Sequence, residues 1–125
     1  MLGAKEAMAT VAVRDLNAAK RFYEGTLGLK LTAAQEQEAL TYEVGGSKLL
    51  VYRSQFAGSN KATATTWLAG NDIEKIVEGL RKKGVAFEHY DMPGLTVKGD
   101  VHVGGGMKAA WFKDPDGNIH ALVSE

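Results

Sequence analysis

The sequence predicts an α+β fold of two tandem β-α-β-β-β modules, which form a curved, cup-like mixed sheet with the helices on its outer faces. Two observations lead to this prediction. The chain passes twice through the order of one strand, one helix and several short strands. The segments 41–53 and 110–123 also match, because each reads as two strands about a glycine-containing turn. Such repetition indicates a duplicated unit, so we expect modules at 1–57 and 58–125 within one structural domain.

The first module begins with a strand and an amphipathic helix. Residues 7–14 are small or β-branched, which favours a strand. Asp15 stands where a helix N-cap would, and apolar residues then recur at helical spacing until Gly25 or Gly28. Gly45-Gly46 suits a two-residue type I′ hairpin. The three short strands of this module are expected at 29–35, 39–44 and 48–53.

The second module repeats this order. Asn71 and Glu74 resemble a capping box at the start of a helix that ends at Gly84. In the turn that follows Phe112, we expect Asp114 and Asp116 to accept hydrogen bonds from backbone N–H groups rather than to form a catalytic pair. The other elements are expected as strands at 62–69, 85–90, 109–112 and 119–123, with a long glycine-containing loop at 91–106.

Composition excludes several classes of function. The 125 residues include 15 basic and 15 acidic side chains, so the formal net charge is zero and neither nucleic acid nor an anionic membrane is an expected partner. There is no cysteine, which removes thiol nucleophiles, thiolate metal sites and disulfides. The sequence shows no signal-peptide pattern and no apolar run long enough to span a bilayer, so we expect a cytoplasmic protein.

Two motifs resemble those of a known family. They are V-x-D-L-x-x-A-x-x-F-Y-x-x-x-L-G-L at 13–29 and F-x-D-P-D-G-N at 112–118. With the duplication, they resemble the vicinal-oxygen-chelate superfamily, which includes glyoxalase I, bleomycin-resistance proteins and extradiol dioxygenases. The resemblance implies that each module curls an open sheet around a metal or ligand site, and that the protein is a homodimer. Both motifs belong to the scaffold, so they specify the fold more strongly than the reaction.

The resemblance also implies where metal ligands would stand. In the family's metal enzymes one ligand is usually a histidine, and Met8 stands at that position here. Another is usually a glutamate, and Ala121 stands there. The matching positions in the other strands of the repeat are Thr65 and Val51. Met, Ala, Thr and Val do not supply the nitrogen and oxygen ligands that a divalent cation requires. We therefore expect no metal and no cofactor. A compensating metal site built from His89, His102 or His120 stays open at this point.

Strand alternation from these positions predicts what lines the cup. The set combines aromatic and thioether surface with a few hydroxyls and one cation, which suits a flat or amphipathic organic ligand. Some of the aromatic residues could equally fill the cup or lie at a dimer interface. The predicted ligand-binding residues are Met8, Thr10, Tyr42, Val51, Arg53, Thr65, Trp67, Trp111 and Ala121.

The leading functional prediction is a metal-independent small-molecule binding protein that resembles bleomycin-resistance proteins. The alternative is a glyoxalase-like or dioxygenase-like isomerase or lyase with a non-standard site around His102. We expect His102 in a loop over the mouth of the cup, where a histidine is the best candidate for a general acid or base. A regulatory or protein-interaction role at the edge of the cup is a third interpretation.

Overall fold

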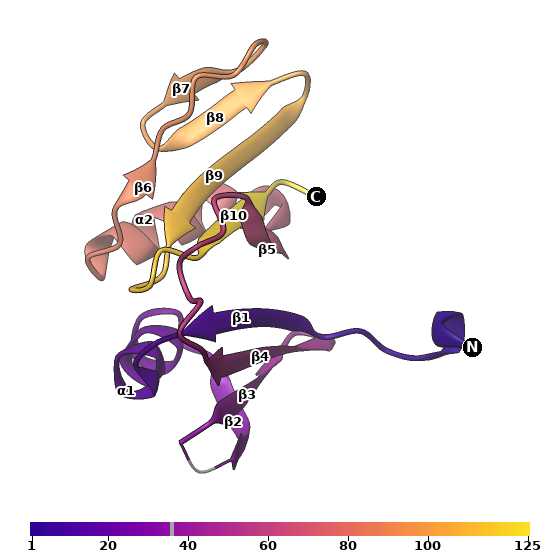
Figure 1. The fold of residues 1–125 in the computed structure, drawn as a ribbon. Helices are drawn as coiled ribbons and strands as arrows, with labels where there is room; N and C mark the ends of the chain where they lie inside the picture. Colours follow the sequence, from indigo (N-terminus) through magenta and orange to yellow (C-terminus); the bar gives the residue numbers. More distant parts are fainter. Residues whose placement is uncertain (36) are drawn as a thin grey trace.

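The computed structural model describes residues 1–35 and 37–125, and in that part of the chain the strands form two mixed sheets (Figure 1). The first sheet has the order β1 (Ala9–Val13), β4 (Ser47–Arg53), β3 (Ala39–Val44), β2 (Lys30–Gln35). The second has the order β5 (Thr63–Leu68), β10 (Ile119–Val123), β9 (Met107–Lys113), β8 (Val101–Gly104), β7 (Thr96–Lys98), and β6 (Phe87–Glu88) also pairs with β9. The predicted α+β class is confirmed.

The two sheets repeat one topology. In each, the first strand of the module pairs in parallel with the last, as β1 with β4 and β5 with β10, and the remaining pairs are antiparallel. One sheet uses strands from 9–53 and the other from 63–123, so no described strand crosses the predicted boundary at residue 57. β1 and β5 lie at the adjoining edges of the two sheets (Figure 1).

The helix of the first module is α1 (Leu16–Lys20), which continues as a π-helical turn, η2 (Arg21–Thr26). The Asp15 carboxylate caps it by accepting hydrogen bonds from the backbone N–H groups of Asn17 (2.9 Å) and Ala18 (3.2 Å). The N-cap expected from the sequence is therefore present. Short 3-10 turns also occur at η1 (Leu2–Ala4) and η3 (Gly70–Asp72).

The helix of the second module, α2 (Ile73–Lys82), starts differently from the prediction. Its N-cap is Asp72, without a side-chain cap hydrogen bond, and Asn71, the expected cap residue, lies within η3. The Glu74 carboxylate instead accepts a hydrogen bond from Lys108 Nζ at 2.6 Å. The capping-box prediction is wrong. None of the described helices is long and apolar enough to cross a membrane.

Two predictions about loops also need correction. The loop between β3 and β4 has two residues, as expected, but only Gly45 has a left-handed φ (55°) while that of Gly46 lies outside this region. A type I′ turn needs positive φ at both positions. The segment 91–106, expected as one loop, contains the β7–β8 hairpin, in which Lys98 pairs with Val101 across a two-residue turn.

The core lies between each sheet and its helix. One buried cluster joins β1, β3 and β4 to α1 and η2, and another joins β8, β9 and β10 to α2. Phe22, Leu27 and Trp67 pack against both clusters. The apolar core is therefore continuous from the first module to the second.

A chain of buried hydrogen bonds links the modules. Trp67 Nε1 donates to His120 Nδ1 (3.1 Å), so the neutral imidazole carries its hydrogen on Nε2 and donates it to the Tyr23 hydroxyl (3.0 Å). The Tyr23 hydroxyl then donates to Asp114 Oδ2 (2.7 Å), which also accepts from Asn118 Nδ2 (2.8 Å). We call these five residues the inter-module chain.

Ionisation within the inter-module chain follows from its burial. Burial lowers the pKa of His120 to about 4, although the nearby Asp114 carboxylate acts in the opposite direction. Burial also raises the pKa of the Tyr23 hydroxyl, and its hydrogen bond and proximity to Asp114 add to this effect. Both groups are therefore neutral near pH 7.

Candidate functional site

The register of the strands shows on which of the two faces of a sheet each side chain lies. One face packs against the helix of its own module, and we call the opposite one the cup face. Residues paired across neighbouring strands point to the same side of a sheet. Because Val11 and Val51 are paired and both lie in the core with α1, their neighbours Thr10 and Leu50 point to the cup face.

Four of the predicted ligand-binding residues agree with this geometry. Thr10 points to the cup face. Met8 comes two residues before Thr10, so an extended backbone directs its side chain to the same face, and 41% of the Met8 surface is exposed. In the second sheet, Ala121 of β10 pairs with Trp111 of β9. Their neighbours Leu122 and Phe112 pack toward α2, so Ala121 and Trp111 point to the cup face.

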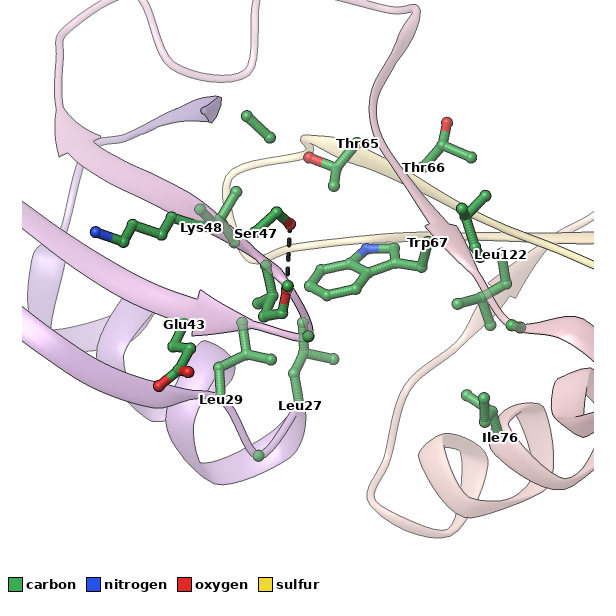
Figure 2. A pocket seen from close by; sticks show the side chains of 18 of the residues that line it. Leu27, Leu29, Glu43, Ser47, Lys48, Thr65, Thr66, Trp67, Ile76 and Leu122 are labelled. Carbon is green, nitrogen blue, oxygen red and sulfur yellow. Dashed lines mark hydrogen bonds between the residues drawn. The ribbon is translucent and has the colours of Figure 1, made fainter. Parts of the chain in front are cut away.

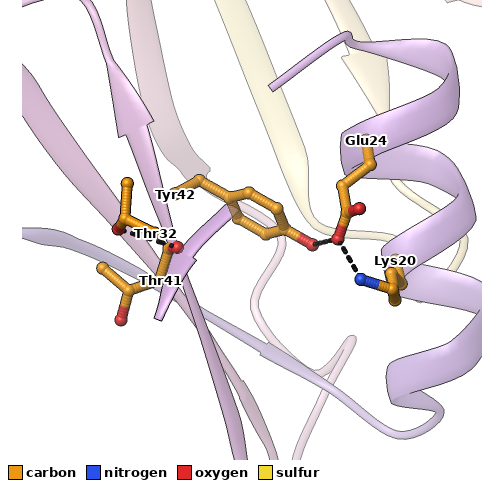
Figure 3. A network of polar contacts seen from close by, with 5 residues as sticks. All are labelled: Lys20, Glu24, Thr32, Thr41 and Tyr42. Atoms are coloured by element: carbon orange, nitrogen blue, oxygen red, sulfur yellow. Dashed lines mark hydrogen bonds and ion pairs between the residues drawn. The ribbon is translucent and has the colours of Figure 1, made fainter. Parts of the chain in front are cut away.

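Tyr42, Val51 and Arg53 point to the other face, so their predicted place in the cup is wrong. Tyr42 and Val51 are fully buried against α1 and η2. The Tyr42 hydroxyl donates to Glu24 Oε2 at 2.9 Å, and that oxygen also accepts from Lys20 (Figure 3). Arg53 pairs with the core residue Val13 and its guanidinium binds Glu38 Oε1 at 3.0 Å. The error is a one-residue slip, which changes the face of every side chain in a strand.

The same slip affects Thr65 and Trp67 in β5. Thr65 pairs with His120 and Trp67 with Leu122, and all four point toward the helix side of the sheet. The Trp67 indole belongs to the inter-module chain. The residue of β5 that pairs with Ala121 is Thr66. The predictions that place Thr65 and Trp67 in the cup are therefore wrong.

His102 lies in β8, where it is fully buried, rather than in the predicted loop over the mouth of the cup. It pairs with Ala109, which pairs in turn with Val123, so its side chain lies on the cup face. The ring contacts Trp111 edge to face, with the ring centres 4.8 Å apart, and the Tyr90 ring lies 6.3 Å away. We call His102, Tyr90 and Trp111 the cup cluster.

Hydrogen bonds fix the tautomer of His102. Its Nε2 accepts the backbone N–H of Tyr90 at 2.9 Å, so the hydrogen of the neutral ring is on Nδ1. Nδ1 is buried and has no hydrogen-bond partner among the described residues. At the edge of the cluster, the half-exposed His89 binds Asp100 Oδ1 through Nε2 (2.8 Å). The cup cluster therefore contains one buried donor without an acceptor.

The side chains of the cup face do not fit a divalent metal ion. On the adjoining strands β1, β4, β5 and β10 they offer hydroxyls, one phenol, the ammonium of Lys48 and hydrocarbon, whereas a divalent cation requires imidazole or carboxylate ligands. Within residues 1–35 and 37–125, no three His, Asp or Glu side chains gather closely enough to hold a metal. The cup-face residues of these four strands include Thr10, Ala12, Lys48, Leu50, Tyr52, Thr66, Leu68, Ile119, Ala121 and Val123.

A cleft of about 760 Å³ lies on the helix side, between the open end of the first sheet and the second module (Figure 2). We call it the inter-module cleft. Sequence reasoning did not predict it, because the cleft arises from how the two modules pack and combines residues far apart in the chain. Its lining includes Leu27, Leu29, the β3–β4 turn, residues 65–68 of β5 with the following Ala69, and Ile76 and Leu80 of α2.

Comparisons with solved structures show the same fold along nearly the whole chain. The glyoxalase family protein from Enterococcus faecalis superposes with a TM-score of 0.73 at 20% identity, covering 98% of this chain and 99% of that one. Lactoylglutathione lyase from Agrobacterium tumefaciens gives 0.72 at 16% identity, covering 96% and 92%. The fosfomycin resistance protein FosX from Mesorhizobium loti gives 0.69 at 14% identity, covering 98% and 92%.

Identities this low establish the fold alone. No curated protein matches the sequence. A family model described as the glyoxalase/bleomycin resistance protein/dioxygenase superfamily matches residues 7–122, which include both sheets and both helices. The chain therefore belongs to the glyoxalase/bleomycin resistance protein/dioxygenase superfamily.

Proposed function

We propose that this protein binds a flat or amphipathic organic molecule at the cup cluster, without a metal ion. The observation that carries the proposal is the buried Nδ1–H of His102, which has no acceptor among the described residues. Leaving such a donor unsatisfied costs about 1–3 kcal/mol. A ligand whose hydrogen-bond acceptor displaces the groups that cover Nδ1 would recover this free energy, and the rings of Trp111 and Tyr90 supply apolar contact beside it.

The chemistry of the cup face supports the proposal that no metal ion is needed. Thr10, Thr66 and Ala121 stand on the strands that adjoin at its centre, and none carries an imidazole or a carboxylate. Elemental analysis of the purified protein by mass spectrometry tests this point. We expect far less than one zinc, iron, manganese or nickel per chain, and ligand binding that survives a chelator. One metal ion per chain whose removal abolishes binding would contradict the proposal.

Binding at the cup cluster can be followed through the indole N–H of Trp111. The chain has two tryptophans, so a ¹H–¹⁵N spectrum contains two indole cross-peaks, which Trp67→Phe and Trp111→Phe assign. We use 2-naphthoate as the probe, because it is flat and its carboxylate accepts hydrogen bonds without donating one. We expect a saturable shift of the Trp111 peak.

The matched variants test the role of His102. His102→Phe keeps a ring but removes the Nδ1–H, so it should weaken 2-naphthoate binding about tenfold or more, as for a hydrogen bond to a charged group. His89→Phe is the control, because His89 is half-exposed and already bonded to Asp100. Equal affinity in wild type and His102→Phe, with the variant folded by circular dichroism, would overturn the proposal.

The same geometry weighs against the enzymatic alternative that uses His102 as a general base. A base needs a free lone pair within reach of the substrate. In this tautomer Nε2 is engaged by the Tyr90 N–H, and Nδ1 already carries the hydrogen. His102 is therefore arranged to donate a hydrogen bond, which suits binding and orientation of an acceptor.

A further inference from the structure

We propose that the inter-module cleft is a second binding site, for an uncharged and largely apolar molecule that carries one hydrogen-bonding oxygen. The volume of the cleft, about 760 Å³, lies within the range of about 300–1,000 Å³ that is usual for small-molecule sites. The cleft is also open to solvent between the two modules (Figure 2). A ligand could therefore enter without unfolding of either module.

The walls of the cleft are apolar and come from both modules. Figure 2 shows Leu27 and Leu29 of the first module on one side of the Trp67 indole, and Leu122 and Ile76 of the second module on the other. These side chains are buried or half-buried, so they are already partly withdrawn from water. A hydrocarbon ligand would bury the apolar surface that remains exposed between them.

The polar feature of the cleft is the hydroxyl of Thr65. Thr65 lines the cleft and is only 9% exposed, and its Oγ1 has no hydrogen-bond partner among the described residues. The residue lies on the helix side of β5, paired with His120. Because a buried hydroxyl without a partner is costly, this atom marks the place where an oxygen of the ligand would bind.

The charges around the cleft favour an uncharged ligand. Lys30, Glu43 and Lys48 are the ionisable residues that contribute to its described lining, and all three are exposed. Glu43 and Lys48 extend away from Trp67 in Figure 2. An ion placed beside Thr65 would thus lose its hydration without gaining a nearby opposite charge. Alcohols, ketones, lactones and phenols match the chemistry of the site.

The cleft is separate from the cup cluster. Trp67 and Thr65 point to the helix side of the second sheet, whereas Trp111 and His102 point to its cup face. The indole peaks of the two tryptophans therefore report on different sites. A probe that binds the cleft moves the Trp67 peak, and a probe that binds the cup cluster moves the Trp111 peak.

The experiment compares 2-naphthol with 2-methylnaphthalene, in which a methyl group replaces the hydroxyl at similar size. We expect both probes to give a saturable shift of the Trp67 peak in the wild-type protein. Thr65→Val, which keeps the shape of the side chain, should weaken 2-naphthol about fivefold, as for a neutral hydrogen bond. The same variant should leave the affinity for 2-methylnaphthalene unchanged.

Two further variants serve as controls. Thr63→Val makes the same chemical change in the same strand, at an exposed residue outside the cleft lining, and should leave both affinities unchanged. Ile76→Trp fills the cleft from α2 and should abolish binding of both probes. The proposal is overturned if the Trp67 peak does not shift saturably, or if Thr65→Val weakens both probes equally. Either result leaves the cup-cluster proposal intact, because that proposal depends on the Trp111 peak.

Discussion

Thr65 has a hydroxyl that is buried and has no partner among the described residues. In the protein without ligand, Thr65→Val removes this unsatisfied group at nearly constant volume. We therefore expect the free energy of unfolding to rise by about 1 kcal/mol. Urea denaturation followed by circular dichroism measures the change, with the exposed Thr63→Val as the control that should differ little from wild type. A loss of stability in Thr65→Val would show that the hydroxyl has a partner in solution.

His120 makes stability depend on pH. Its pKa is about 4 in the folded protein, against 6.5 for the unperturbed side chain, so the unfolded chain binds more protons between these values. The free energy of unfolding should be fully retained above pH 6.5 and should fall as the pH falls toward 4. From a shift of this size we expect a loss of about 3 kcal/mol over the interval.

The check is urea denaturation at a series of pH values in wild type and two variants. His120→Gln removes the titrating group, so the component of the slope between pH 6.5 and 4 that comes from His120 should disappear. His89→Gln makes the same substitution at a half-exposed histidine and controls for the loss of an imidazole as such. If the slope persists in His120→Gln, another group is responsible for it.

At the scale of single elements, the two helix starts give a paired prediction. The Asp15 carboxylate caps α1 through two backbone N–H groups, so Asp15→Ala should lower the free energy of unfolding by about 1 kcal/mol. Asn71 lies within η3 and makes no cap hydrogen bond to α2, so Asn71→Ala should change it by less than about 0.5 kcal/mol. Thermal unfolding of both variants measures the difference. If both variants lose the same free energy of unfolding, Asn71 caps α2 as the sequence predicted.

The sequence was sufficient for most elements because turn residues and periodicity marked them locally. The strands 39–44 and 119–123 are found at the predicted positions, and Asp15 caps the helix as expected. The β7–β8 hairpin was missed although 96–103 alternates β-branched residues about Gly99-Asp100, which is a hairpin signal. The run of glycines at 104–106 favours a loop, so the pattern of the whole segment 91–106 is ambiguous.

The faces of the strands were harder to predict than their limits. Leu40, Tyr42 and Val44 alternate with more polar residues, and this pattern alone would have placed Tyr42 in the core. Anchoring the register on the family's metal-ligand positions instead moved Val51 and Thr65 to the wrong face. A histidine or carboxylate at a metal-ligand position would show which residue of the strand faces the cup. Val51 and Thr65 are not metal ligands, so the sequence alone does not reveal the one-residue error.

At the scale of the whole molecule, the segment between β4 and β5 connects the two modules, and it packs tightly against the turn before β10. Gly58 has a left-handed φ of 77°, and a Cβ at this position would collide with the carbonyl oxygen of Asp116. Gly58→Ala should therefore lower the free energy of unfolding by about 2 kcal/mol or more, from both backbone strain and the collision. Urea denaturation measures the loss.

Gly28 supplies the matched control. Its φ of 73° is nearly the same, but a Cβ there would meet open space. Gly28→Ala therefore reports the backbone strain alone, expected at about 1 kcal/mol. If Gly28→Ala and Gly58→Ala lose equal stability, Gly58 does not lie close to the Asp116 carbonyl oxygen in solution.

Neither the inter-module cleft nor the buried donor at His102 could have been predicted from the sequence. The cleft combines residues of both modules, such as Leu27 and Trp67, and the buried donor depends on the hydrogen bond between His102 and the backbone of Tyr90. Local patterns specify which side chains share a face of one strand. They do not specify how the two sheets adjoin, which forms the cleft, or which backbone N–H of the second module reaches His102.

The inter-module chain makes the two halves of the protein non-equivalent. Its hydrogen bonds run in one direction, from Trp67 through His120 and Tyr23 to Asp114, and only Tyr23 comes from the first module. The two halves share a topology, yet this chain needs one residue from the first half and the others from the second. A protein built from two copies of either half would therefore lose this pairing.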